Sequence, residues 1–144
     1  MSADEEKPNF SGKYKHVKSE NFEAFLQANG APWIARKMAS AANPNLEVIQ
    51  DGDNFILRLT GMIFTTESKF TVGKEFEDKQ HGGTIMKVMP KWEGKKLVLD
   101  FTPKEGEVNA KPHKTTREIQ DNKLILTMEM EEVKCVKVFE KLTA

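Results

Sequence analysis

The sequence has only one cysteine, Cys135, so no disulfide can form within the chain. It also has no apolar run as long as a signal-peptide core or a membrane-spanning helix. Structural disulfides are typical of secreted proteins and of other oxidising compartments. The two absences together predict a cytoplasmic location.

An excess of charge of either sign is missing as well. Lysine and arginine number 22, aspartate and glutamate number 22, and the net charge at pH 7 is zero. Domains that bind nucleic acid carry clustered basic residues that neutralise phosphates. We therefore expect no nucleic-acid partner.

Motifs for catalysis, metal binding and cofactor binding are absent. His16, His81 and His113 lack ligand spacing and have no cysteine pair nearby, so no metal site is expected. Serine, histidine and aspartate occur without a nucleophile motif, and there is no glycine-rich phosphate loop. Cys135 is interpreted as a small buried apolar residue and not as a reactive thiol. The sequence predicts a protein that is not an enzyme and has no cofactor.

The 144 residues suffice for one domain with a core, or with a core around a cavity. Residues 1–8 are polar and predict a short flexible arm. Residues 9–144 are expected to form the single domain, because no repeat or linker divides them.

Helical periodicity occurs in one region, from about residue 19 to residue 42. The first part has apolar residues at i, i+3 and i+4: Phe22, Phe25 and Leu26. Ser19 is the expected N-cap and Asn29-Gly30 the expected stop. A second helix is expected from Pro32 until Asn43-Pro44 ends it. The pattern predicts a helical hairpin.

The rest of the chain reads as short strands separated by turn residues. Ten strands are expected, at residues 12–17, 46–50, 54–60, 64–71, 74–76, 84–91, 96–102, 113–119, 123–129 and 133–141. Such strands, with no helices between them after residue 44, indicate antiparallel connections and a closed or nearly closed barrel. The fold class predicted is all-β.

Polar residues interrupt the apolar pattern of the last three strands. Thr115, Arg117, Thr127 and Lys137 lie among apolar neighbours, whereas a packed small barrel should be apolar inside and polar outside. The pattern predicts an interior that is partly polar.

Segments along the whole chain resemble one family in their order. They are residues 12–23 (GKYKHVKSENFE), Ala35-Arg36-Lys37, Asn43-Pro44, residues 54–59, Thr66-Glu67 with Phe70, residues 73–76 (GKEF) and residues 123–127 (KLILT). From about Asn9 to Leu142 the chain resembles the intracellular lipid-binding proteins, the fatty-acid-binding and cellular retinoid-binding proteins of the calycin superfamily.

The resemblance implies a ten-stranded flattened barrel, the β-clam, with a helix-turn-helix lid between the first two strands and a large cavity. It also implies a monomeric, cytoplasmic carrier that binds and transports long-chain fatty acids. Trp33, Arg36 and Lys37 of the helical lid are expected to touch anionic membranes transiently.

The family often anchors a ligand carboxylate with two arginines and a tyrosine. Arg117 matches the first arginine, while the Arg-x-Tyr position reads Lys137-Val138-Phe139 and lacks the phenol. Arg117 and Lys137 are therefore the expected carboxylate-binding residues. The residues expected to line the cavity or its portal are Phe139, Phe22, Phe25, Met38, Ile63, Phe64, Thr115 and Cys135.

Other interpretations of the same sequence stay open. The ligand could be a retinoid, a bile acid or another hydrophobic acid, or the barrel could be a filled structural or protective protein. Arg117 could instead form a surface ion pair with Glu118, and Lys137 could extend to solvent.

Overall fold

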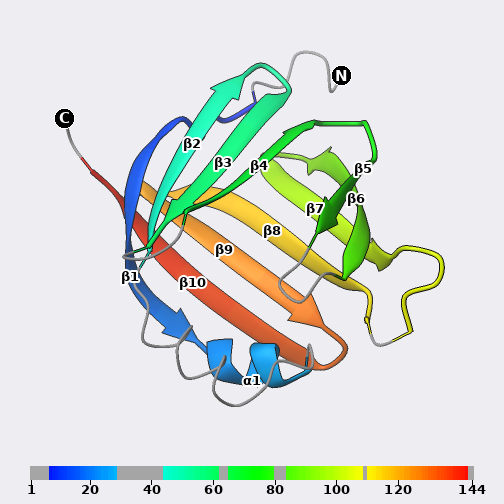
Figure 1. Cartoon of the computed structure of the whole chain (residues 1–144). Coiled ribbons are helices and arrows are strands. Elements are labelled where there is room, and N and C mark those ends of the chain that lie inside the picture. Colours follow the sequence, from blue (N-terminus) through cyan, green and yellow to red (C-terminus); the bar gives the residue numbers. More distant parts are fainter. Residues whose placement is uncertain (1–6, 29–43, 62–64, 80–83, 109, 143–144) are drawn as a thin grey trace.

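The computed structural model describes residues 7–28, 44–61, 65–79, 84–108 and 110–142. These residues form ten strands and one helix (Figure 1). The elements are β1 (Gly12–Glu20), α1 (Phe22–Ala28), β2 (Asn45–Asp51), β3 (Asn54–Thr60), β4 (Thr65–Thr71), β5 (Phe76–Lys79), β6 (Ile85–Glu93), β7 (Lys96–Pro103), β8 (His113–Gln120), β9 (Lys123–Met130) and β10 (Val133–Lys141).

All ten strands belong to one antiparallel sheet in the order β4-β3-β2-β1-β10-β9-β8-β7-β6-β5. Each strand pairs with the next one in the chain except β4 with β5, and β1 also pairs with β10, so the sheet curls into a nearly closed barrel (Figure 1). The predicted all-β barrel is confirmed. The two edge strands, β4 and β5, share no ladder, and stacking of Phe70 on Phe76 connects them with ring centroids 5.4 Å apart.

The hairpin turns form at the residues that the sequence indicates. Asp121 and Asn122 connect β8 to β9 with φ values of 50° and 64°, a left-handed conformation that these residues tolerate. Gly52 between β2 and β3 has a φ of 61° for the same reason. Turn chemistry therefore fixes the register of these hairpins.

Two local predictions are wrong. Ser19 does not cap the helix but belongs to β1, opposite Lys137, because strand pairing with β10 continues to Glu20. Asn21 then turns the chain with a φ of 61°, and its carbonyl accepts a hydrogen bond from the Phe25 amide at 3.0 Å.

The fifth strand was predicted too early in the chain. Lys74 belongs to a turn in which its amide donates to the Thr71 carbonyl at 3.1 Å, and the strand begins only at Phe76. The second predicted helix, from residue 32 to residue 42, lies outside the described residues.

The N-terminal segment closes one end of the barrel. The Phe10 side chain is 1% exposed and lies against Phe55 and Trp92, at 6.2 Å from each ring. The Gln50 side chain holds the segment, since its Oε1 accepts from the Phe10 amide at 2.7 Å and its Nε2 donates to the Pro8 carbonyl at 3.2 Å. The main core lies at this end, and the predicted arm boundary at residue 8 stays a prediction.

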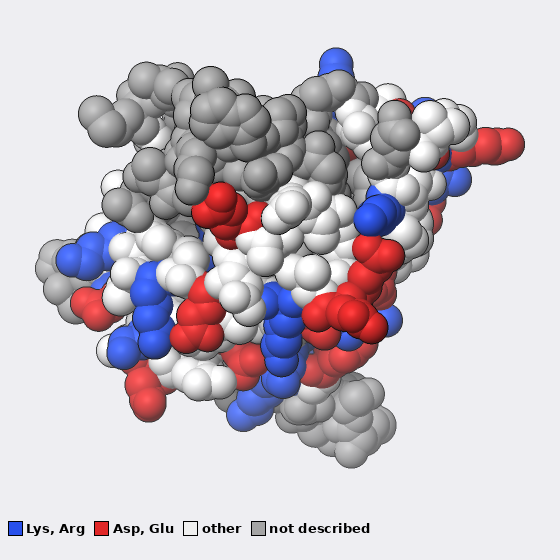
Figure 2. Space-filling model, turned by 90° about the horizontal axis from the view of Figure 1, so that it is seen from below, with Lys and Arg blue, Asp and Glu red and all other residues white. Residues whose placement is uncertain are grey.

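Charged side chains of both signs alternate on the outside. On the face seen in Figure 2, lysine and arginine lie interspersed with aspartate and glutamate. Elsewhere on the exterior, Arg58 bridges Glu47 and Glu67 across three strands at 2.7 Å each. Among the described residues, no helix has the length and apolarity needed to cross a membrane.

Candidate functional site

Strand register places Arg117 and Lys137 on the same, inner face of the sheet. Lys137 of β10 lies opposite Leu126 of β9, and Leu126 lies opposite Arg117 of β8. Because neighbouring strands are about 4.8 Å apart, the two cationic residues are separated by roughly 10 Å at the backbone. Both side chains can therefore approach one ligand group from adjacent parts of the wall.

The same register corrects one sequence interpretation. Thr127 pairs with Val136 and Thr116 and so lies on the outer face, because successive strand residues alternate between faces. Of the four polar residues that the sequence singled out, Thr115, Arg117 and Lys137 thus face the interior and Thr127 does not.

Arg117 is surrounded by protein and has few hydrogen-bond partners. Its Nη1 donates to Thr115 Oγ1 at 3.4 Å, and its buried Nε has no partner among the described residues. Desolvation lowers the pKa of Arg117 to about 10. The expected alternative, an ion pair with Glu118, does not form, since Glu118 pairs with Lys96 at 3.7 Å on the outer face.

A guanidinium in this state is suited to an anionic ligand. It has hydrogen-bond donors that are not used within the described protein, and it stays charged at neutral pH despite desolvation. A buried charge without a partner costs free energy, and a carboxylate would remove that cost through two parallel hydrogen bonds.

Lys137 is the second inward cation, and it contacts the helix. Its Nζ lies 3.4 Å from the ring centroid of Phe22 in α1. Desolvation lowers the pKa of Lys137 to about 8. The aromatic face partly compensates for lost water, as expected for a cation–π contact. The alternative in which Lys137 extends to bulk solvent does not match this contact.

Phe139 and Cys135 share the inner face with Lys137, two residues away on either side. Phe139 is 2% exposed and its ring meets His16 edge-on at 5.6 Å, so no hydroxyl is available at this position. Cys135 is fully buried beneath α1, and burial raises the pKa of its thiol. This part of the inner face therefore offers two cations and the hydroxyl group of Thr115, and position 139 supplies no phenol.

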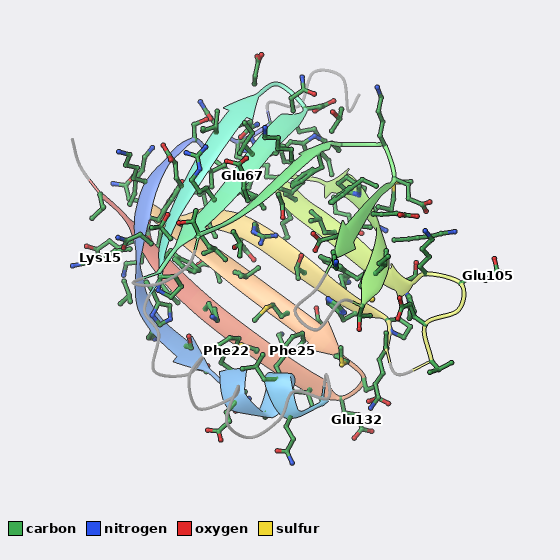
Figure 3. The ribbon with its side chains drawn as sticks, in the orientation of Figure 1. Lys15, Phe22, Phe25, Glu67, Glu105 and Glu132 are labelled. Carbon is green, nitrogen blue, oxygen red and sulfur yellow. The ribbon has the colours of Figure 1, made fainter. Side chains whose placement is uncertain are left out.

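The helix α1 covers the end of β9 and β10. Figure 3 shows Phe22 and Phe25 pointing from α1 into the barrel. Phe25 is 5% exposed and packs with Met130 and Cys135. These contacts hold the only described helix against the wall that carries Lys137.

Sequence reasoning missed His113 as an interior residue. Its ring stacks on Phe101 at 4.3 Å and meets Phe25 edge-on at 5.9 Å. Desolvation lowers the pKa of His113. The sequence could have indicated this, since His113, Thr115 and Arg117 are spaced two residues apart and therefore lie on the same face of β8.

Six predicted site residues lie outside the described residues. They are Met38, Ile63 and Phe64 of the expected lining, and Trp33, Arg36 and Lys37 of the expected membrane-contact surface. Their roles stay predictions.

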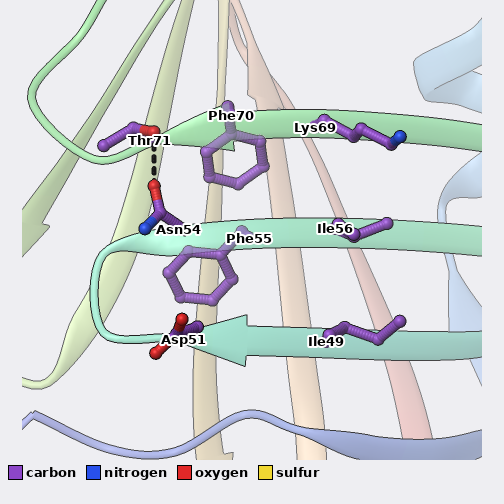
Figure 4. Close-up of a pocket in the computed structure, with 8 residues that line it drawn as sticks. All are labelled: Ile49, Asp51, Asn54, Phe55, Ile56, Lys69, Phe70 and Thr71. Atoms are coloured by element: carbon purple, nitrogen blue, oxygen red, sulfur yellow. Dashed lines mark hydrogen bonds between the residues drawn. The ribbon is translucent and has the colours of Figure 1, made fainter.

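A separate groove of about 380 Å³ lies on the β2–β4 side of the barrel (Figure 4). Its lining residues are Ile49, Asp51, Asn54, Phe55, Ile56, Lys69, Phe70 and Thr71. Thr71 Oγ1 donates to Asn54 Oδ1 at 2.7 Å, so these two polar groups bind each other. Neither Arg117 nor Lys137 lines the groove, and we therefore place the candidate site on the inner face.

Metal chemistry finds no support in the described part of the chain. No group of three or more histidine, cysteine, aspartate or glutamate side chains there is arranged to hold a metal ion.

Comparison with known proteins identifies the family. The profile of the lipocalin / cytosolic fatty-acid binding protein family matches residues 11–142. The chain belongs to this family. Human cellular retinoic acid-binding protein 2 is 39% identical over 135 residues, covering 92% of this chain and 97% of that protein. Bovine cellular retinoic acid-binding protein 1 is 37% identical with the same coverage.

Solved structures of the family have the same fold. The fatty-acid-binding protein from brain tissue of Drosophila melanogaster superposes with a TM-score of 0.81 at 34% identity, covering 92% of this chain and 99% of that one. The REP1-NXSQ fatty acid transporter gives a TM-score of 0.83 at 28% identity, covering 93% and 96%. The predicted resemblance is confirmed.

Proposed function

We propose that this protein is a non-enzymatic cytoplasmic carrier that holds a long-chain fatty acid inside its barrel. The observation that carries the proposal is the Arg117 guanidinium, enclosed by protein, with a buried Nε that has no partner among the described residues. Membership of a family described as cytosolic fatty-acid binding supports both the ligand class and the location.

The apolar tail and the carboxylate head of the ligand would contribute to binding in different ways. Each methylene moved from water into an apolar interior contributes about 0.8 kcal/mol, so the tail supplies most of the affinity. The carboxylate would accept hydrogen bonds from Arg117 and Thr115, with Lys137 as a second positive charge. Since Phe139 offers no hydroxyl, a water molecule would complete the head-group contacts.

Retinoic acid is a second candidate ligand. The relatives named cellular retinoic acid-binding proteins are 37% and 39% identical to this chain over nearly its whole length. Retinoic acid presents the same two features, an apolar body and one carboxylate, so Arg117 does not distinguish the two. A retinol-type alcohol would leave the guanidinium unpaired and should bind less well.

Competition binding tests both candidates. A fluorescent fatty-acid probe is bound to the wild-type protein and then displaced with oleate, retinoic acid or retinol. We expect saturable probe binding, displacement by the acids at lower concentration than by retinol, and a preference for oleate. A preference for retinoic acid would favour the second candidate, and absence of saturable binding would overturn the carrier proposal.

Two variants locate the head-group site. Arg117→Ala should weaken oleate binding about 10- to 100-fold, the range expected for loss of charge-assisted hydrogen bonds. Arg58→Ala is the matched control, because Arg58 pairs with glutamates on the outer face and should leave binding unchanged. Equal oleate affinity of Arg117→Ala and wild type would move the head group elsewhere.

The predicted monomeric state and the predicted membrane contact through Trp33, Arg36 and Lys37 remain parts of this proposal.

A further inference from the structure

Lys137 places a primary amine in a half-buried and largely apolar setting on the inner face. Its neighbours on this face are Cys135 and Phe139 on β10, Leu126 on β9 and, on β1, Ser19, whose hydroxyl is hydrogen-bonded to the His16 ring at 2.6 Å. Phe22 covers its ammonium group at 3.4 Å from the ring centroid. Among the described residues, no carboxylate forms an ion pair with it. Lys137 is therefore an amine facing the space in which an apolar ligand chain would lie.

The setting favours the neutral, nucleophilic form of the amine. With a pKa of about 8, about 20% of Lys137 is uncharged at pH 7.4, against less than about 0.1% for a lysine of ordinary pKa. A lysine desolvated in an apolar pocket is a typical nucleophile toward carbonyl groups. Lys137 can thus react with a carbonyl that the barrel holds near it.

We propose that Lys137 captures long-chain aliphatic aldehydes covalently and reversibly, as an imine inside the barrel. This inference rests on the proposed function to the extent that the interior must accept a long apolar chain. It goes beyond that function because the ligand is an aldehyde and a covalent bond forms.

The reaction balances without a further reactant. The Nζ lone pair attacks the carbonyl carbon, and the proton that leaves nitrogen is transferred to the oxygen, giving a carbinolamine. The nitrogen lone pair then expels the hydroxyl, which takes up a proton and leaves as water while the C=N bond forms, and loss of the remaining N–H proton returns that proton to solvent. Hydrolysis reverses the sequence. Phe22, which now faces the ammonium, can face the protonated imine in the same way.

Lys137 differs from the other lysines of β10 in its burial, and from Lys134 also in the face of the sheet on which it lies. Lys134 and Lys141 are exposed on the same strand, whereas Lys137 is half-buried and faces inward. An aldehyde bound by its tail would be held near Lys137 and away from Lys134, which raises its effective concentration at one amine only. Lys134 is therefore the matched control.

The test uses hexadecanal and sodium cyanoborohydride, which reduces an imine to a stable secondary amine. Wild-type protein is treated at pH 7.4, and peptide mapping by mass spectrometry locates the alkyl group. We expect at least about tenfold more modification at Lys137 than at Lys134. Excess oleate should suppress modification at Lys137 and leave Lys134 unaffected.

Variants and probe binding complete the test. Lys137→Arg should lose the single preferred adduct, whereas Lys134→Arg should keep it. Equal modification of Lys137 and Lys134 in the wild type, or an unchanged adduct yield in Lys137→Arg, would overturn the inference. If either of these results is obtained and the fatty-acid probe still binds the wild-type protein, the aldehyde inference fails and the carrier proposal stands. If the probe does not bind and Lys137 is still modified preferentially, the carrier proposal fails and the aldehyde inference stands.

Discussion

At the scale of single residues, the proposed function implies that the two inward cations lower the stability of the empty protein and favour binding of an anion. Arg117 and Lys137 are desolvated by the fold, and burial lowers the pKa of each. A charge held without a counter-charge destabilises the empty protein, and an anionic ligand would remove that cost. Such trade-offs are typical of functional sites.

We predict that Lys137→Met stabilises the ligand-free protein at pH 7. The folded-state pKa of Lys137 is about 8, below the ordinary 10.5, so the folded state binds a proton less readily than the unfolded state. The resulting penalty is present below pH 8 and disappears as the pH rises from 8 to 10.5. Removing the charge should raise the free energy of unfolding by about 1 to 3 kcal/mol.

Urea denaturation at several pH values measures this effect. The advantage of Lys137→Met over wild type should shrink toward pH 10.5. Lys134→Met, on the exposed side of the same strand, should change stability by less than about 0.5 kcal/mol. A loss of stability in Lys137→Met at pH 7 would contradict the prediction.

His113 should make the protein less stable in mild acid. Because desolvation lowers the pKa of His113, the unfolded state binds its proton first as the pH falls below about 6.5. His113→Phe keeps a ring beside Phe101 and cannot be protonated. The free energy of unfolding should fall less between pH 7.5 and 5 in the variant than in wild type. Equal pH dependence of the unfolding free energy in the two proteins would show that His113 does not cause the loss of stability in acid.

At the scale of elements, the described barrel has one junction without backbone hydrogen bonds, the seam between β4 and β5. β4 and β5 are the two edge strands of the sheet and share no ladder, and the stack of Phe70 on Phe76 connects them. Elsewhere around the described barrel, backbone hydrogen bonds connect each strand to the next. Local opening should therefore begin at this seam.

We predict that Phe76→Ala loosens the seam and costs about 2 kcal/mol of stability, since it removes aromatic packing from a partly buried site. Hydrogen exchange should accelerate in β4 and β5 before it does in β8 to β10. Lys79→Ala, at an exposed position of β5, is the control and should leave exchange unchanged. Uniform acceleration across all strands would contradict a local seam.

At the scale of the whole molecule, ligand binding and stability are linked. A ligand that binds only the folded barrel stabilises it by about 2.7 kcal/mol at a concentration of 100 times Kd. For a chain of this size, that corresponds to an increase in Tm of roughly 5–10 °C.

We predict that oleate raises the Tm of wild-type protein by this amount and raises that of Arg117→Ala much less. Arg58→Ala should respond like wild type, because its ion pairs lie outside the barrel. Calorimetry at fixed oleate concentration measures the three shifts. Equal shifts in wild type and Arg117→Ala would show that the head group does not use Arg117.

The sequence by itself determined the fold class and most strand positions. Short strand-forming runs and turn signals such as Asp121-Asn122 are local properties, so they can be read from the chain. β3 and β10 have the predicted bounds. Local signals failed at Ser19 and Lys74, where pairing with a distant strand or closure of a turn outweighed local preference.

Only the tertiary structure decided what the site residues face. Arg117 and Lys137 were predicted from the resemblance, but their common inner face follows from the register of β8, β9 and β10. A one-residue shift in register would move a side chain to the opposite face, and the sequence left open which face each polar residue takes, since Thr127 lies outward and Arg117 inward. Burial, which lowers the pKa of Lys137, and the contact of its Nζ with the ring of Phe22 both arise only in the folded barrel, because Phe22 lies far from Lys137 in the sequence.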